Sequence, residues 1–267
     1  MDVVWLKKDA RLSDHGPLSS VLLPADGAPT VGTFARHEAT ATAAPFVVLY
    51  LYEPSLLRHQ TAHGSHVVFT NEGLAELEAG LQLLRREGAP AEGELEPEPS
   101  AILTTRVAEA VDALEELHRS AAGPIARLLS HEETGHLSSY GRDKAVKRWC
   151  RANGVLWQEF EQSGVVRGLK SRADAEAQPF AERWNQFMSA SAHPDPRTSA
   201  ALRSQAGLRL RAALVPGLET AGLVAPTDAR LAMPHPEDRP HRQRQAHKQS
   251  SPQLDYCEFL LKWPLFQ

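Results

Sequence analysis

The chain has 267 residues, enough for one large domain or two small ones, and its 42% hydrophobic and 23% charged residues are typical of a globular protein. With 29 Lys and Arg against 33 Asp and Glu, the formal net charge is −4, which excludes an overall positive field that would hold nucleic acid nonspecifically. Cys150 and Cys257 are too few and too far apart for a disulfide framework or a cysteine-rich zinc site. Because no secretion signal and no run of about 18 apolar residues occurs, we expect an intracellular protein, whether cytoplasmic, nuclear or organellar.

Five short apolar runs predict buried β-strands, because their length and their β-branched or aromatic content favour strands over helix fragments. They are Val3–Leu6, Phe46–Tyr52, a weaker run at Ala101–Thr104, Ile125–Leu129 and Val155–Phe160. Apolar residues that recur at a period of about 3.6 predict helices between and after the strands. The predicted helices are Ser65–Arg86, Val107–His118, Ser138–Asn153, Ala181–Met188 and Ser199–Leu214.

This alternation predicts an α/β fold, a doubly wound five-stranded parallel sheet with helices on both faces. Such sheets bind ligands outside the carboxyl ends of the strands, where the strand order reverses. The loops after the first, third and fourth strands are therefore candidate sites. We expect residues 1–190 to form this domain and residues 191–267 to form an irregular, partly helical and largely disordered tail, because the pattern weakens there and Pro234–Pro252 is polar.

Two histidine-rich segments resemble metal sites without matching one. His59, His63 and His66 would share one side of a helix, but Gly64 lies among them, so solvated loop histidines are favoured. In the segment from His131 to His136 the second histidine is five residues after the first, whereas the zinc-protease motif HExxH requires four. The sequence therefore predicts no metal site.

Nucleotide-hydrolysing and hydrolase motifs are also missing from the sequence. Gly27–Gly32 has the glycine spacing of a phosphate loop, but Thr33 stands where a lysine is required. No GxSxG elbow occurs. These classes of enzyme are excluded.

The loop after the first strand is densely charged. Lys8, Asp9 and Arg11 follow that strand, and an ion pair between Asp9 and Arg11 would fix the turn. Asp14 would cap the helix that Pro17 helps to begin. This structural role is the simplest interpretation of the loop.

Two adjacent carboxylates, Glu132 and Glu133, follow the fourth strand. They could accept hydrogen bonds from a heterocyclic ligand, or they could face the amino end of the next helix. That helix also has a basic polar face, made by Arg142, Lys144, Lys147, Arg148 and Arg151. The basic face could be a solvated surface or a phosphate contact.

Four sequence blocks occur together in a fixed order. They are Lys8–His15 (KDARLSDH), Phe46–Pro54, Ser65–Leu81 with Asn71-Glu72, and Leu128–Trp157 with Glu132-Glu133 and Arg142-Asp143. The first resembles the pattern R-x-D-L-R-x-x-D-N, with His15 in place of Asn. The last, in Arg142-Asp143-x-x-Val146, is similar to the pattern E-x-x-x-x-R-D-x-x-V. Over roughly residues 1–190 the chain thus resembles photolyases and cryptochromes, and the joint order is more specific than any one block.

The resemblance implies an α/β domain that holds an antenna chromophore of folate or flavin type. In the family, an all-helical domain follows, which binds FAD and performs blue-light-dependent DNA repair, the deoxyribodipyrimidine photolyase activity, or signalling. The implied antenna site comprises Lys8, Asp9, Arg11, Glu132 and Glu133, and the resemblance assigns no catalytic residue in this chain.

Too few residues follow Ala190 to build the FAD-binding domain. We therefore expect a truncated, spliced or frameshifted product that lacks FAD and repairs no DNA by itself, although DNA binding is expected of the full-length family. Two alternatives stay open: a stand-alone nucleotide-binding module, and a regulatory fragment that docks on a full-length flavoprotein.

Overall fold

The structure is a computed structural model, and it describes residues 1–23, 44–88, 101–135, 137–164, 180–213, 215 and 218–228. Several features considered above, Gly27–Gly32, Thr33, His136, Pro234–Pro252 and Cys257, lie outside the described residues. The described helices include no candidate for a transmembrane segment.

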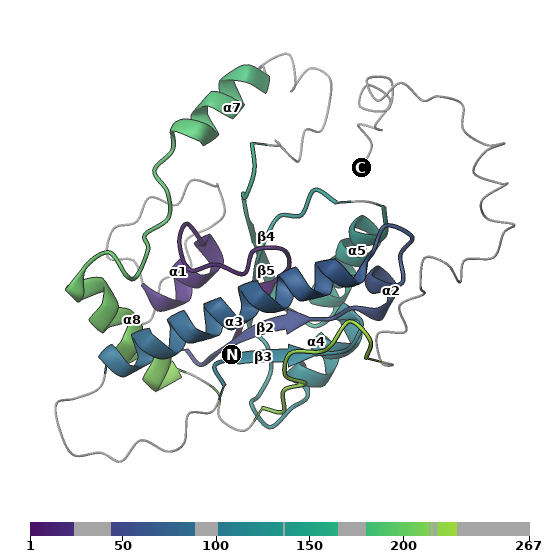
Figure 1. Cartoon of the computed structure of the whole chain (residues 1–267), viewed down its shortest axis with the longest axis horizontal. Helices are drawn as coiled ribbons and strands as arrows, with labels where there is room; N and C mark the ends of the chain where they lie inside the picture. Colours follow the sequence, from purple (N-terminus) through teal and green to yellow (C-terminus); the bar gives the residue numbers. More distant parts are fainter. Residues whose placement is uncertain are drawn as a thin grey trace, which may run out of the picture. The chain divides into compact units, whose positions relative to one another are not determined.

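Five parallel strands form one sheet in the order β3-β2-β1-β4-β5 (Figure 1). They are β1 (Asp2–Leu6), β2 (Phe46–Leu51), β3 (Leu103–Arg106), β4 (Arg127–His131) and β5 (Leu156–Phe160). Asp2 is in register with Phe46 of β2 on one side and with Arg127 of β4 on the other. The strand order therefore reverses between β1 and β4. The predicted doubly wound, five-stranded parallel sheet is confirmed, with strand ends that differ by a few residues.

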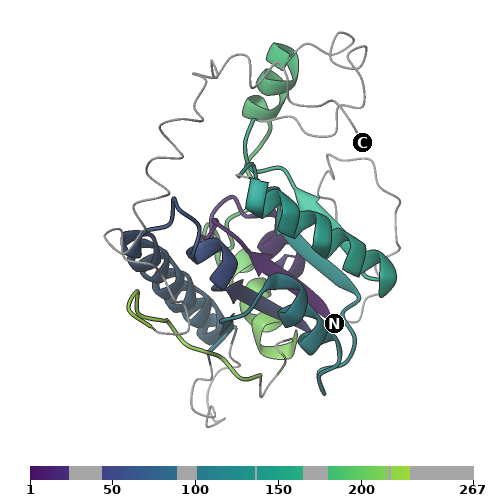
Figure 2. The same ribbon diagram turned by 90° about the vertical axis from the view of Figure 1, so that its right-hand side faces the viewer.

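Helices cover both faces of the sheet, with α3 (Gly64–Glu87) on one side and α5 (Leu137–Ala152) on the other (Figure 2). The other helices of the layers are α1 (Gly16–Leu22) and α8 (Ala200–Ala213) with α3, and α4 (Ala110–His118) with α5. A short helix, α2 (Pro54–Leu57), follows β2. Val4 and Leu6 belong to the core beneath α3, whereas Val3 and Trp5 belong to the core beneath α5. Burial on both faces explains why the strands appear in the sequence as continuous apolar runs.

The chain divides into two compact units, one made of Met1–Gln162 and Ala192–Met233 and the other of Ser163–Ser191 and Pro234–Gln267. One boundary of this division, between Ser191 and Ala192, lies next to the expected domain end at residue 190, but Ala192–Met233 belongs to the same unit as Met1–Gln162. In the first unit, α8 packs against α3 and fully buries Ala206 and Leu210, so this part of the expected tail belongs to the α/β core. In the second unit, the described helix is α7 (Phe180–Ser189).

Candidate functional site

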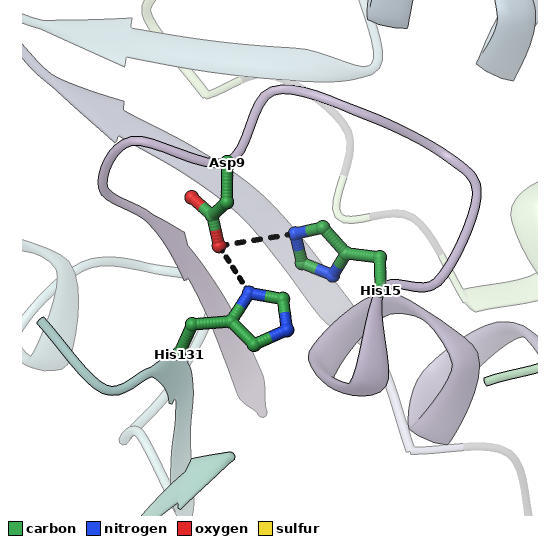
Figure 3. A group of neighbouring side chains, drawn as sticks. All are labelled: Asp9, His15 and His131. Carbon is green, nitrogen blue, oxygen red and sulfur yellow. Dashed lines mark hydrogen bonds and ion pairs between the residues drawn. The ribbon is translucent and has the colours of Figure 1, made fainter. Parts of the chain in front are cut away.

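Asp9 lies at the switch point of the sheet, in the loop that follows β1. The Lys7 amide donates a hydrogen bond to Asp9 Oδ1 over 2.7 Å. The other carboxylate oxygen, Oδ2, lies 2.5 Å from Nδ1 of His131, at the end of β4, and 3.2 Å from Nε2 of His15 (Figure 3). All three side chains are buried. The reversal of strand order thus brings two histidines onto one carboxylate.

A second hydrogen bond fixes the proton on His15. The Leu18 amide donates to His15 Nδ1 over 3.1 Å, which caps α1. Because Nδ1 is the acceptor, the neutral ring carries its proton on Nε2, the atom that faces Asp9. Burial lowers the pKa of His15, and Asp9 only partly offsets this effect. Burial alone would raise the pKa of Asp9, but the two histidines hold that pKa well below its usual range.

The facing atoms of Asp9, His15 and His131 lie within 4.8 Å of one another, close enough to surround a metal ion. A metal at Nε2 of His15 would require a lone pair there, and the proton would then move to Nδ1 and face the Leu18 amide. The 2.5 Å separation of Asp9 Oδ2 and His131 Nδ1 is a hydrogen-bond distance. It is shorter than the separation of about 3.3 Å between two ligand atoms of a tetrahedral zinc ion. The contact between Asp9 and His131 is therefore better described as a hydrogen bond than as two ligands of one zinc ion.

Beside this cluster, Arg142 of α5 binds three carboxylates. It donates from Nη1 to Glu53 over 2.8 Å, and from Nη2 to Glu133 over 2.5 Å and to Asp143 over 2.9 Å. Its guanidinium also lies 4.8 Å from the ring centroid of Trp5. On the other side of Asp143, Lys7 Nζ is 3.3 Å from Oδ2. These contacts join the ends of β1 and β2, the loop after β4, and α5.

Within the described part of the chain, two buried carboxylate oxygens of this group, Glu53 Oε2 and Glu133 Oε1, have no hydrogen-bond partner. Lys8 Nζ forms an ion pair with Glu133 Oε1 at 3.0 Å. Burial raises the pKa of Glu53 to about 7 although Arg142 opposes the change. Burial also acts to raise the pKa of Glu133, but Arg142 and Lys8 together lower it below the usual value. Buried acceptors without a partner are unfavourable, so this pair of oxygens favours a ligand that donates hydrogen bonds.

The five predicted antenna residues have different surroundings. Lys8, Asp9 and Glu133 take part in the contacts above. Arg11 makes no ion pair with Asp9 and instead donates to the carbonyls of Ser13 and Asp14, over 3.1 and 2.9 Å. The backbone N–H of Glu132 donates to Phe160 of β5 over 2.8 Å. Glu133 binds the side chain of Arg142, so it does not merely face the amino end of α5.

The helix-cap prediction for Asp14 is wrong, because His15 caps α1. Asp14 has a positive φ of 47°, and its Oδ1 accepts the backbone N–H of His193 over 2.9 Å. Sequence reasoning also left Glu53 out of the site. Its signal was an acidic residue between the buried second strand and Pro54.

The three histidines considered as a zinc site lie in loop and helix-start positions. His63 accepts a hydrogen bond from the Ser65 amide over 3.2 Å and so caps α3. His59 lies 2.9 Å from the Thr61 hydroxyl. These local hydrogen bonds account for both side chains without a metal.

Comparison with known proteins identifies one family: its model, described as DNA photolyase, matches residues 2–199. None of the curated proteins compared is similar to the chain. Among solved structures, a bacterial class III photolyase from Agrobacterium tumefaciens is similar, with 17% sequence identity and a TM-score of 0.43. The match covers 72% of this chain and 33% of that chain, so the chain spans about a third of that photolyase's length.

Proposed function

Because the chain belongs to the DNA photolyase family, we propose that it supplies the α/β domain of a blue-light-dependent DNA-repair or photoreceptor flavoprotein. In that role it holds an antenna chromophore at the carboxyl edge of the sheet. The observation that carries this proposal is the pair of buried oxygens, Glu53 Oε2 and Glu133 Oε1, for which the described residues supply no hydrogen-bond partner. They lie at the edge where sheets of this kind bind ligands.

The residues at this edge suit a folate- or flavin-type ring in their hydrogen-bonding character. Rings of both types carry N–H groups, and a buried carboxylate binds such donors strongly. Glu53 and Glu133 offer the acceptors, with Glu132 next to Glu133 in the loop after β4. Lys8, whose side chain is 65% exposed, can pair with an anionic part of the same molecule. When bound, the chromophore supplies the light absorption.

Asp9 and Arg11 serve this site by shaping its loop. Asp9 is bound to His131 and to the Lys7 amide, and Arg11 is bound to two carbonyls of its own loop. Each therefore positions the segment that carries Lys8.

We further propose that this chain alone does not repair DNA. The repair reaction of the family depends on FAD in a separate helical domain. In the first compact unit, α1, α3 and α8 cover one face of the sheet, and α4 and α5 cover the other. These helices are thus committed to the α/β core, and a flavin domain would have to lie outside the described residues.

Titration of the purified chain with FMN and with a reduced folate, followed by ligand fluorescence, tests the antenna role. We expect one of the two to bind in equimolar amount. Glu133→Gln should weaken that binding by about tenfold or more, because a charge-assisted hydrogen bond is lost. Glu76→Gln, on the exposed side of α3, is the matched control and should leave affinity unchanged.

Two results would refute the antenna role. One is that neither chromophore binds. The other is binding that Glu133→Gln and Glu53→Gln leave intact. Tight binding of ATP that excludes both chromophores would instead support a stand-alone nucleotide-binding module.

A further inference from the structure

Helices α3 and α5 each carry a row of exposed side chains whose spacing alternates between three and four residues. The α3 outer row is Glu72, Glu76, Ala79, Leu83 and Arg86, and the α5 outer row is Leu137, Tyr140, Lys144, Lys147 and Arg151. Side chains with this spacing lie along one side of a helix and form the seam when two helices pack side by side. Each row extends over about 21 Å, at about 1.5 Å per residue.

Both rows include large apolar side chains that water reaches. Leu83 is 56% exposed, Leu137 71% and Tyr140 39%. The opposite sides of the two helices are buried, with Leu81 of α3 in the core on one face of the sheet and Val146 of α5 in the core on the other (Figure 2). The two outer rows therefore cannot meet within one copy of the chain.

The charges of the two rows are opposite in sign. In the part of the chain that the structure describes, the acids of the α3 outer row and the cations of the α5 outer row form no ion pair. The pKa of Arg197 is raised mainly by its hydrogen bonds to Asp195 and to a smaller extent by Glu76. Both sets of charges are thus open to an outside partner of the opposite charge.

We propose that the α5 outer row of one copy of this chain packs antiparallel on the α3 outer row of a second copy. Read forwards from Glu72, the α3 outer row has the same alternation of spacings as the α5 outer row read backwards from Arg151. This alignment places Glu72 opposite Arg151, Glu76 opposite Lys147, Ala79 opposite Lys144, Leu83 opposite Tyr140, and Arg86 opposite Leu137. It combines two ion pairs with an apolar contact, and the aliphatic stem of Arg86 covers Leu137.

Other pairings of these rows are less favourable. A parallel pairing keeps one ion pair, between Lys144 and Glu76. An antiparallel pair of α3 outer rows places Glu72 opposite Leu83 and Glu76 opposite Ala79, without an ion pair. Two α5 outer rows place cations against cations, which is unfavourable.

The contact thus joins two different surfaces, and its repetition builds chains or rings of copies instead of a closed pair. The inference is independent of the antenna role, because no carboxylate of the sheet edge takes part.

Sedimentation velocity of the full chain tests the contact. A single helix on a single helix is a small interface, so we expect a Kd of about 10 to about 100 μM. Species larger than a monomer should grow with protein concentration. Salt at about 0.5 M should dissociate them, because the ion pairs are exposed and are screened.

Two double variants, each of which removes one row, make the test specific. Glu72→Lys with Glu76→Lys removes the α3 outer row, and Lys147→Gln with Arg151→Gln removes the α5 outer row. Each variant alone should associate at least about tenfold more weakly than the wild type. Mixed in equal amounts, the two variants should form a one-to-one dimer and nothing larger, since the mixture contains one intact contact per pair.

The double variant Asp112→Lys, Glu182→Lys is the matched control, because both acids are exposed on other helices. It makes the same change of charge as the α3 variant and should assemble like the wild type. Circular dichroism checks that all variants fold. A wild type that stays monomeric at about 200 μM in low salt, a mixture of the two variants that stays monomeric, or a mixture that grows as large as the wild type would each overturn the proposal.

Discussion

Arg142 donates a hydrogen bond from Nη1 to Oε1 of Glu53 over 2.8 Å, and this contact joins the start of α5 to the end of β2. The same guanidinium also binds Glu133 and Asp143. One cation therefore holds three carboxylates that little water reaches. The electrostatic balance of the sheet edge depends on it.

Replacing this cation should destabilise the protein strongly. Arg142→Met keeps the length of the side chain but removes the cation that binds Glu53 and one of the two cations beside Glu133 and Asp143, and breaking buried ion pairs in this way costs about 3–5 kcal/mol. Urea unfolding measures the loss. Arg148→Met, on the exposed side of the same helix, should change the free energy of unfolding by less than about 0.5 kcal/mol. Similar losses in the two variants would contradict the role given to Arg142.

Glu53 should make stability depend on pH in a defined window. Its pKa rises on folding from 4.5 to about 7 because the carboxyl is buried. The folded state then binds the proton more tightly than the unfolded state, so the free energy of unfolding falls as pH rises from about 4.5 to about 7. A shift from 4.5 to about 7 corresponds to about 3 kcal/mol.

Glu53→Gln removes this dependence. The quantity to compare is the free energy of unfolding of the variant minus that of the wild type. This difference should be about 3 kcal/mol more positive at pH 7.5 than at pH 4.5, as measured by urea unfolding at both pH values. The histidines titrate in both proteins and cancel in the comparison. A difference that does not vary with pH would show that Glu53 keeps an ordinary pKa.

Two substitutions in the loop after β1, Asp9→Asn and Asp14→Asn, test whether the charge of Asp9 stabilises the protein. Asp9→Asn removes the charge that accepts the proton of His131 and faces His15, and should lower the free energy of unfolding by about 3 kcal/mol. Asp14→Asn keeps an acceptor for the His193 amide, and Asn tolerates the positive φ of this position. It should change stability by less than about 0.5 kcal/mol. Thermal unfolding of the two variants measures both changes in stability. Equal losses would argue against a buried charge at Asp9.

Replacing glycine by alanine should have opposite effects on stability at Gly207, where α8 contacts α3, and at Gly141 in α5. A side chain at Gly207 would overlap the backbone of Leu84 and Gly88, so Gly207→Ala should cost about 2 kcal/mol or more. No described residue has an atom within 4 Å of the corresponding position at Gly141, and Gly141→Ala should stabilise α5 by about 0.5–1 kcal/mol. Urea unfolding measures both. Stabilisation by both substitutions would mean that α8 does not pack closely on α3.

The sheet could be predicted from sequence because its strands are apolar on both faces. Val3 to Leu6 alternate between the two cores, so the whole run is hydrophobic and its length points to a strand. The helix α5 was equally clear, since Val146, Trp149 and Cys150 recur with helical spacing. Local patterns were sufficient for both.

The site was less accessible from sequence, because it depends on contacts between distant residues. Asp9 and His131 are 122 positions apart, and they meet only because β1 and β4 are neighbours. The positive φ of Asp14 left His15 to cap α1, which sequence preference alone would not suggest. Glu53 lies at the start of α2, an ordinary position for an acidic residue. Its raised pKa follows from its burial, which the sequence does not show.

The packing of α8 against α3 could not be predicted from the sequence either. Gly88 and Gly207 allow two backbones to approach closely, and no periodic pattern in one helix identifies its partner. For that reason the domain boundary was expected near residue 190, although Ala206 and Leu210 are core residues.

The most direct test of the proposed function is to express the chain, record its visible absorption spectrum, and assay thymine-dimer reversal under blue light with and without added FAD. We predict that no FAD binds in equimolar amount and that no repair occurs under either condition. A yellow protein with equimolar FAD that reverses dimers in light would contradict the account.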